Sequence, residues 1–247
     1  MDPTESESQL RVDLAAALRW ASKLGFGEGV CNHFSAAIPG AAERFLINPQ
    51  GLHWSEVTPA DLVVVDAHGR KVTGRHNVEP TAFFIHGCIH RGKPDARVVL
   101  HTHMPYATAL TVVQGGRLEW ASQNSLKFYN RVAYDDDYNG LALDDAEGER
   151  MCRQLASADV LFLANHGIIV TGQTLPETFD DLYYLERACM LQVLGAGTGK
   201  PLRVVPEAVA ALTARQMQHE SEQAALHFEA LKRLLDRDDP GWRGEPH

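Results

Sequence analysis

The sequence predicts one domain of the α/β class, built from both helices and strands. Its 247 residues are 45% hydrophobic, which suffices for one sizeable core and requires no second domain. In some segments apolar residues recur three and four positions apart, as in amphipathic helices, whereas short β-branched runs bounded by glycine, proline or asparagine are typical of strands. We therefore expect a single domain over residues 1–247.

The composition narrows the class of partner. A formal net charge of -9 makes a nucleic acid or an anionic membrane surface an unexpected partner, so we expect a small-molecule ligand. The start, MDPTESESQ, lacks the basic and then apolar pattern of a secretory signal, and no run of about 18 apolar residues occurs. The cysteines are far apart and form no CxxC motif, which is typical of reduced thiols. These features predict a soluble, cytoplasmic protein.

The first third is expected to hold one helix and a small meander of strands. Apolar spacing predicts a helix over Leu10–Leu24 that ends at Gly25. Strands are expected at Ala36–Ile38, Phe45–Ile47 and Leu62–Asp66, with turns over residues 48–51 and 67–69.

The glycine-rich segment GFGEGVCNHFS joins that helix to the strands. It lacks the lysine of a phosphate-binding loop and the GxGxxG register, so we do not expect a nucleotide site there. Asn32 and Ser35 are its polar groups of interest. They either face a ligand or satisfy backbone groups at a helix-to-strand turn.

A second helix is expected to begin at Pro80, where the missing N–H costs nothing, with Glu79 as the candidate N-cap. Helical spacing places an acid and two imidazoles along one stripe with Ala82: Glu79, His86 and His90. Such a stripe is unusual for a helix that packs only on apolar groups. The histidines are either candidate catalytic groups or side chains that hydrogen-bond buried backbone.

Two histidines follow the next strand. The run Arg97–Leu100 suits a buried strand, and His101 and His103 stand two residues apart just beyond it. Extended backbone would point both imidazoles to one side. An imidazole pair suits a borderline metal such as Zn²⁺, but a third ligand must come from elsewhere.

The second half supplies that ligand. Strands at Val160–Leu163 and Ile168–Val170 flank His166, whose neighbour Gly167 allows an unusual backbone conformation, and His166 is the natural third ligand. Tyr134–Tyr138 (YDDDY) lacks the spacing and the glycine of an EF-hand, so we expect a solvated loop.

Helices account for the rest of this half. They are expected at Pro105–Val113 and Ala146–Ala156, and a capping box at Thr174 starts a long helix that reaches Gly195. A last helix is expected over Glu207–Arg237, within residues 206–237, and the end DDPGWRGEPH is expected to fray.

Several segments together resemble the class II aldolase/adducin family, over roughly Leu10–Gly195, within residues 9–196. They are NHFS, INPQG, PTAFFIHGCIH, HTH, SLKFYNRVAY and LANHGIIVTG. The resemblance implies a three-layer α/β/α sandwich with a central, largely antiparallel sheet, in a homotetramer with its active site near a subunit contact. It also implies a divalent metal, most commonly zinc with manganese or iron as alternatives, held by His101, His103 and His166 as a Lewis acid.

The chain departs from the sugar-phosphate aldolases of that family. Their catalytic glutamate falls on Ala82, so Glu79 either replaces it as an acid or base or is an N-cap. Their phosphate-binding serines fall on Pro80 and Thr81, and proline has no N–H for an anion, so a phosphorylated sugar is not expected. The tyrosine that these aldolases carry some way past the HxH pair falls near Ser122 and Gln123, so its oxyanion role is not carried over to this chain. The matching segments place four residues at the candidate substrate pocket: Asn32, Ser35, Gly51 and Thr81.

The resulting leading hypothesis is a metal-dependent carbon–carbon lyase, of decarboxylase or aldolase type, acting on a small non-phosphorylated carboxylate or carbonyl compound. Decarboxylation fits the missing glutamate better, because loss of CO₂ needs mainly an electron sink and a later proton donor, for which His86 or His90 is available. Several aromatic side chains would suit a ring-containing substrate: Trp54, Phe83, Phe128 and Tyr129. The alternatives are a non-haem iron oxygenase on the same three histidines and a non-catalytic, adducin-like interaction domain.

Overall fold

An eight-stranded sheet forms the centre of the molecule in the computed structural model, which describes residues 6–41, 43–66, 68–217 and 221–244. The strand order is β4-β3-β2-β1-β5-β8-β7-β6, and every neighbouring pair is antiparallel except β6 and β7. The strands are β1 His33–Ala37, β2 Arg44–Ile47, β3 Val63–Asp66, β4 Lys71–Thr73, β5 Val98–Thr102, β6 Val132–Asp135, β7 Val160–Leu163 and β8 Gly167–Gly172. The largely antiparallel central sheet is thus confirmed.

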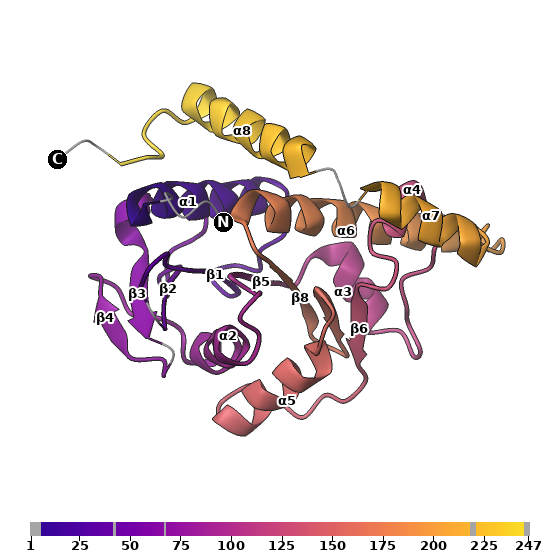
Figure 1. The fold of residues 1–247 in the computed structure, drawn as a ribbon, viewed down its shortest axis with the longest axis horizontal. Coiled ribbons are helices and arrows are strands. Elements are labelled where there is room, and N and C mark those ends of the chain that lie inside the picture. The colour runs from indigo at the N-terminus through magenta and orange to yellow at the C-terminus, as the bar shows by residue number, and fades with distance from the viewer. Residues whose placement is uncertain (1–5, 42, 67, 218–220, 245–247) are drawn as a thin grey trace.

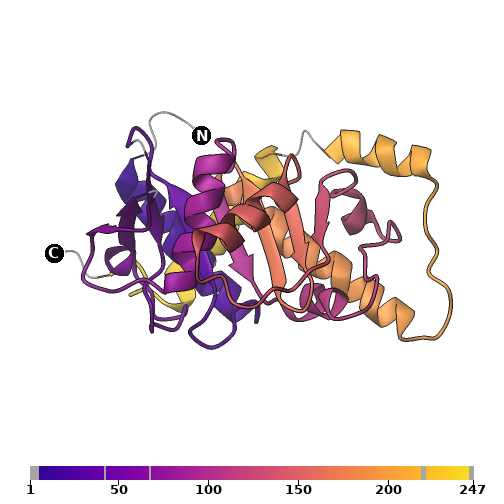
Figure 2. The ribbon, with the colours of Figure 1, turned by 90° about the horizontal axis from the view of Figure 1, so that it is seen from below.

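Helices cover both faces of the sheet (Figure 1). One layer contains α1, α3 and α6, and the opposite layer contains α2 and α5, which lie side by side (Figure 2). The helices are α1 Glu7–Lys23, the 3₁₀ turn η1 Pro59–Asp61, α2 Pro80–Gly92, α3 Pro105–Thr111, α4 Gln123–Leu126, α5 Asp145–Leu155, α6 Leu175–Ala196, α7 Glu207–Met217 and α8 Ser221–Asp238. This arrangement confirms the α/β/α sandwich. None of the described helices is long and apolar enough to cross a membrane.

Strand alternation decides which side chains face each helix layer. In β5, Val98 and Leu100 belong to the core beneath α1 and α6, so Val99 and His101 face the opposite layer. In β1, Phe34 and Ala36 join the same core as Val98, which turns the remaining side chains of that strand toward α2. The polar stripe of α2 and the polar side chains of β1 therefore meet across a single interface.

β1 begins earlier than the sequence predicts. The expected strand covers Ala36–Ile38, whereas β1 covers His33–Ala37. Ser35 and His33 are both buried, and they form hydrogen bonds in place of apolar contacts. The prediction rests on alternating hydrophobic and polar residues, and the buried polar side chains of His33 and Ser35 remove that pattern from the first half of the strand.

The YDDDY run is not a solvated loop throughout. Its first two residues belong to β6, and Asp135 is buried beside Arg150, with 2.6 Å between Asp135 Oδ2 and Arg150 Nη1. Only Asp136–Tyr138 form an exposed segment. The ion pair balances the charge of the buried carboxylate, and it is a long-range contact that local sequence does not indicate.

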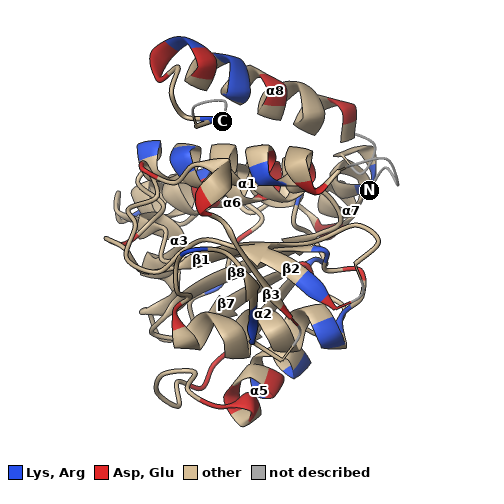
Figure 3. Ribbon diagram, turned by 90° about the vertical axis from the view of Figure 1, so that its left-hand side faces the viewer, with Lys and Arg blue, Asp and Glu red and all other residues tan. Residues whose placement is uncertain are grey.

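The C-terminal region holds two helices where one is expected. α7 ends at Met217 and α8 begins at Ser221, and residues 218–220 between them lie outside the described part of the chain. α8 lies over α1 and α6, on the side away from the sheet (Figure 3). The polar run QMQHE at residues 216–220 interrupts the apolar periodicity on which the single helix rests.

The expected fraying of the chain end beyond α8 is wrong as far as Gly244. Trp242 is fully buried, and its indole Nε1 donates a hydrogen bond to Asp236 at 2.8 Å. The Trp20 indole also donates to the Leu231 carbonyl, which joins α1 to α8. Residues 245–247 lie outside the described residues.

Replacing Phe228 by alanine is expected to lower the free energy of unfolding by about 3–5 kcal/mol, because it removes a buried ring and leaves a cavity. The Phe228 ring is 1% exposed and lies 5.8 Å from the ring of Phe179 in α6. Urea denaturation measures the change. Leu226→Ala is the matched control on the same helix, where the side chain is 57% exposed and a change within about 0.5 kcal/mol is expected. Equal effects of the two substitutions would contradict the packing of α8 on α6.

Candidate metal centre and active site

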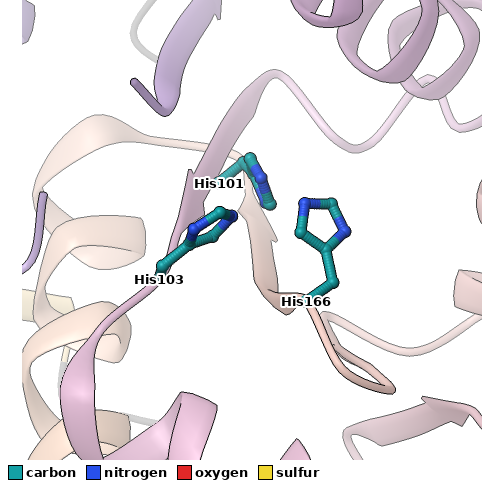
Figure 4. Close-up of side chains that lie close together, drawn as sticks. All are labelled: His101, His103 and His166. Carbon is teal, nitrogen blue, oxygen red and sulfur yellow. The ribbon is translucent and has the colours of Figure 1, made fainter. Parts of the chain in front are cut away.

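Three imidazoles converge at the edge where β5 ends and β7 turns into β8 (Figure 4). The strand pairing explains this, because β8 lies between β5 and β7 and pairs Ile168 with Thr102. His166 in the β7–β8 turn therefore lies beside His101 and His103, and candidate ligand atoms of the three lie within 4.8 Å of one another. It is the only such group of three among the described residues.

The turn that carries His166 needs small and permissive residues. Asn165 has φ +56°, a left-handed conformation that asparagine tolerates better than most residues. A Cβ atom at Gly167 would lie 2.5 Å from the Thr102 carbonyl oxygen and 2.6 Å from a carbon of the His103 ring. The glycine therefore permits the close approach that brings the third imidazole to the pair.

Hydrogen bonds orient two of the imidazoles and leave one nitrogen of each available. His101 Nδ1 donates to the Ile168 carbonyl at 2.9 Å, which leaves the Nε2 lone pair unprotonated. His103 Nδ1 contacts the carboxylate of Glu28, and its Nε2 is buried without a hydrogen-bond partner among the residues that the structure describes. A buried nitrogen without a partner beside two other imidazoles fits a divalent metal.

Burial keeps two of the three imidazoles uncharged. Burial first, and then the neighbouring imidazoles, lower the pKa of His101 well below its usual value and that of His166 to about 4. Both rings are therefore neutral at pH 7, which is the state that binds a metal. Imidazole donors of this kind suit zinc or iron better than calcium.

Replacing Glu28 by glutamine is expected to weaken metal binding about 10–100-fold, because the carboxylate on His103 Nδ1 orients the ring and increases the basicity of Nε2. Competition with a chelator of known affinity measures the change. Glu222→Gln, on the exposed side of α8, is the control. An affinity as high as that of the control would contradict the role of Glu28.

A hydrogen-bonded chain runs between α2 and β1. Its members are Glu79, His33, His86, Ser35 and His90, named here the imidazole chain. The atoms and distances are Glu79 Oε2 to His33 Nε2 2.8 Å, His33 Nδ1 to His86 Nε2 3.1 Å, His86 Nδ1 to Ser35 Oγ 2.5 Å, Ser35 Oγ to His90 Nε2 2.8 Å, and His90 Nδ1 to the Ala96 carbonyl 3.0 Å. The stripe expected on α2 thus faces the sheet and contacts β1.

The imidazole chain needs one more proton than its neutral side chains hold. Each of its five hydrogen bonds requires one proton, whereas three neutral imidazoles and one hydroxyl provide four. Neither the Ala96 carbonyl nor a Glu79 carboxylate has one, and the Thr81 hydroxyl already donates to Glu79 at 2.6 Å. A complete chain therefore carries one additional proton.

The additional proton belongs at the Glu79 end. Burial lowers the pKa of His86 well below its usual value and that of His90 to about 4, so these two rings stay neutral. The hydrogen bond from His33 lowers the pKa of Glu79, so the carboxyl group is the ionised acceptor of this bond. The pair of Glu79 and His33 is thus the proton-bearing end.

This pair lies next to the three imidazoles. His33 and His101 are directly paired across β1 and β5, and their rings stack with centroids 5.1 Å apart. The sequence reasoning missed His33 as a functional residue. Its position two residues before Ser35, in phase with it along a strand, is the signal that would have found it.

The predicted substrate-binding residues lie at different distances from this centre. Asn32, at φ +74°, accepts a hydrogen bond from the His103 backbone through its side-chain oxygen. Ser35 and Thr81 belong to or contact the imidazole chain. Gly51 lies in an exposed turn, and no hydrogen bond within the described residues joins it to the other candidates.

Glu79 occupies the N-cap position of α2, but its side chain makes no capping hydrogen bond. It reaches His33 instead, at 2.8 Å. The simple N-cap interpretation is therefore wrong for the side chain. The first turn of α2 keeps its conformation through Pro80 and the backbone bond from Ala82 to the Glu79 carbonyl.

Most of the predicted substrate-contacting aromatics do not face the metal centre. Trp54 and Phe128 are buried in the core beneath α1 and α6, and the Tyr129 hydroxyl donates to Glu207 at 2.9 Å. Phe83 packs on the small core between α2 and β3. An aromatic side chain that does lie beside the site is Tyr138, 51% exposed with its ring centroid 6.5 Å from that of His166.

Comparisons with known proteins agree with this architecture. A family model described as "Class II Aldolase and Adducin N-terminal domain" matches residues 12–193. A putative aldolase class 2 protein of Caulobacter vibrioides is 35% identical over 97% of this chain and 93% of its own length. The decarboxylase NovR of Streptomyces niveus is 34% identical over 86% of this chain and 79% of its own length.

A third relative carries an oxygenase name. It is the 4-hydroxy-3-prenylphenylpyruvate oxygenase/4-hydroxy-3-prenylbenzoate synthase of Streptomyces roseochromogenus subsp. oscitans, 34% identical over 86% of this chain and 77% of its own. Among solved structures, an aldolase II superfamily protein from Pseudomonas syringae has a TM-score of 0.90 at 35% identity over 97% of both chains. The L-fuculose 1-phosphate aldolase of Glaciozyma antarctica has a TM-score of 0.84 at 26% identity, over 94% of this chain and 92% of its own.

Proposed function

Since the chain belongs to the class II aldolase and adducin family, we propose that it is a metal-dependent carbon–carbon lyase. We propose a decarboxylase that acts on a small, non-phosphorylated carboxylate with an adjacent carbonyl or ring. The observation that carries this proposal is the proton-bearing pair of Glu79 and His33, stacked through His33 on a convergent three-imidazole centre.

The metal would be held by His101, His103 and His166, and we propose zinc, with manganese and iron as alternatives. When bound, such an ion supplies a Lewis acid that withdraws electrons from a substrate oxygen. The fit rests on the neutral imidazoles and on the buried, partnerless nitrogen of His103.

Residues of the imidazole chain would complete the reaction. Cleavage of the bond to the carboxyl group releases CO₂ and leaves the bonding electron pair on the substrate, which then needs a proton at carbon. Glu79 and His33 hold a proton next to the centre, and a proton from water restores the pair afterwards. Retro-aldol cleavage instead needs a base at the position of Ala82, which carries none.

The start of α2 disfavours a phosphorylated substrate. Pro80 occupies the first helical position and offers no N–H to an anion. The side chain of Glu79 at the N-cap is an ionised hydrogen-bond acceptor, so it offers no donor to a phosphate. These two features support a substrate without phosphate.

The remaining expectations are also proposals. We propose a homotetramer, as the family suggests, in which a second subunit contributes to the pocket, and a cytoplasmic location. We also propose that the whole chain forms one domain. Light scattering coupled to gel filtration measures the oligomeric state, and a monomer with full activity would contradict the shared pocket.

Incubation with 2-oxo acids and aromatic carboxylates, with CO₂ release followed and products identified by NMR, tests the reaction class. In D₂O, one deuterium is expected at the carbon that lost CO₂, because solvent replenishes the proton-bearing pair. L-Fuculose 1-phosphate is the phosphorylated control. Cleavage of that sugar phosphate, without CO₂ release from any acid, would contradict the proposal.

An oxygenase is the second candidate, since one relative bears that name and a three-histidine centre also suits Fe²⁺. Anaerobic purification, metal analysis and an oxygen electrode separate the two reactions. Stoichiometric consumption of O₂ with each turnover of an iron-loaded protein would favour the oxygenase. CO₂ release at an undiminished rate without O₂ would favour the lyase.

A further inference from the structure

A second cavity lies at the far end of the imidazole chain. It has a volume of about 610 Å³ and lies between the hairpin of β1 and β2 and the loop that joins α2 to β5. His90 forms part of its wall. This volume falls in the range of about 300–1,000 Å³ that is typical of small-molecule sites.

Two arginines line this cavity without partners. Among the described residues, neither Arg44 nor Arg97 has a hydrogen-bond acceptor or a carboxylate at its side chain, and Arg97 Nε is buried with its hydrogen unused. A buried donor without an acceptor destabilises the folded state, so a ligand oxygen there would be favourable. Arg91 also lines the cavity, but it pairs with Asp145 at 3.8 Å.

Apart from Arg91 and Glu43, the rest of the wall is apolar or neutral. Ile38, Phe45 and Pro94 line it, and the Phe45 ring lies 4.6 Å from the ring of His90. Both nitrogens of His90 are used, by Ser35 and by the Ala96 carbonyl, so His90 presents a ring surface rather than a free donor. A ligand therefore meets both charged and apolar groups in the cavity.

We propose that this cavity binds a small organic monoanion, a carboxylate on a compact apolar or aromatic body. The carboxylate would accept hydrogen bonds from Arg97 and Arg44, for which a planar two-oxygen group is well shaped. The exposed Glu43 also lines the cavity, and its negative charge disfavours a phosphate dianion. The site is separate from the three-imidazole centre and is independent of the proposed reaction.

The position of His90 links this site to the metal centre. A carboxylate in the cavity would lie against the side chain that forms the outer end of the imidazole chain, whose inner end is Glu79. The cavity is therefore adjacent to the outer end of the imidazole chain.

Titration of the full-length protein with sodium benzoate, by calorimetry and by NMR, tests the proposal. Saturable binding is expected for the unchanged protein, with at least a tenfold loss in Arg97→Ala and in Arg44→Ala and a smaller loss in Arg97→Lys. Arg237→Ala, which removes an exposed arginine paired with Asp238, is the matched control and is expected to bind normally. The variant with His101 and His103 both replaced by alanine is also expected to bind benzoate normally, because the site lies elsewhere.

Two results would overturn the proposal. Benzoate binding that survives both arginine substitutions but disappears in the double histidine variant would place the anion at the metal centre. Binding of inorganic phosphate in the cavity with no binding of benzoate would contradict a monoanion with an apolar body. Circular dichroism of each variant shows whether the fold is retained, and Arg97→Lys keeps the test valid if Arg97→Ala does not fold.

Discussion

A protein in which His101 and His103 are both replaced by alanine is expected to purify without stoichiometric metal. A single imidazole from His166 is too few ligands for a tight site, so the affinity is expected to fall by several orders of magnitude. Metal content by mass spectrometry and titration with Zn²⁺, Mn²⁺ and Fe²⁺ measure the loss. The fold is expected to survive, because the two side chains contribute mainly to the site edge of the sheet.

A second pair of histidines provides the control for this prediction. His53 and His68 are exposed, and their joint replacement by alanine is expected to leave metal content unchanged. Retention of stoichiometric metal by the His101 and His103 variant would contradict the ligand assignment. If the unchanged protein has no affinity for any of the three ions, a non-catalytic, adducin-like interaction domain becomes the better interpretation.

The sequence alone locates the three imidazoles because each one follows or interrupts a strongly apolar strand. His101 continues the run that contains Val98, and His166 separates two short strands. In both cases the strand just before the histidine is a run of apolar residues, Val98–Leu100 and Val160–Leu163. The sheet order then brings the two strand ends together, which the sequence indicates only through the family resemblance.

His33 shows where such reasoning fails. It is buried, yet its side chain is polar, so it removes the hydrophobic alternation at the start of β1. Its partners are far away in the chain, Glu79 by 46 residues and His86 by 53. Local periodicity carries no information about hydrogen bonds between residues so far apart in the sequence. The imidazole chain can therefore be recognised only from the packing of α2 on the sheet.

Local sequence also fails to predict the packing of the C-terminal region, because long-range contacts hold it in place. α8 is held by residues near the start of the chain, for example by the ion pair between Lys232 and Asp13, whose Nζ and Oδ1 atoms lie 2.8 Å apart. Trp242 is buried although glycine and proline surround it in the sequence. A turn-rich composition predicts fraying only where no long-range contact holds the segment.

Stability measurements across pH are expected to reveal the ionised state of Glu79. Its pKa is lowered in the folded state, chiefly by the hydrogen bond from His33, so it stabilises the protein above the pKa of the unfolded chain. That contribution is lost as the pH falls through the folded-state pKa. The difference in Tm between the unchanged protein and Glu79→Gln is therefore expected to shrink as the solution is acidified.

Glu79→Gln is expected to lower kcat by a factor of about 10²–10⁴, the usual range for loss of a general acid or base, while metal content stays the same. The substitution keeps the size of the side chain, but an amide cannot share a proton with His33 as the carboxylate does. Product formation from the best substrate and metal analysis on the same preparation separate the two effects. Glu149→Gln, an exposed glutamate on α5, is the control and is expected to retain full activity.

Because the Glu79 side chain makes no capping hydrogen bond, this prediction distinguishes a catalytic role of Glu79 from a capping role. A pure N-cap would lose about 1 kcal/mol of stability on substitution and leave the rate unchanged. The Glu79 side chain instead contacts His33 and Thr81, so the variant is expected to lose rate, and its Tm at neutral pH is expected to fall by the contribution of the ionised carboxylate. An unchanged kcat together with a lower Tm would show that Glu79 only supports the first turn of α2, and the source of the proton would then have to be sought elsewhere, first at Tyr138 beside His166.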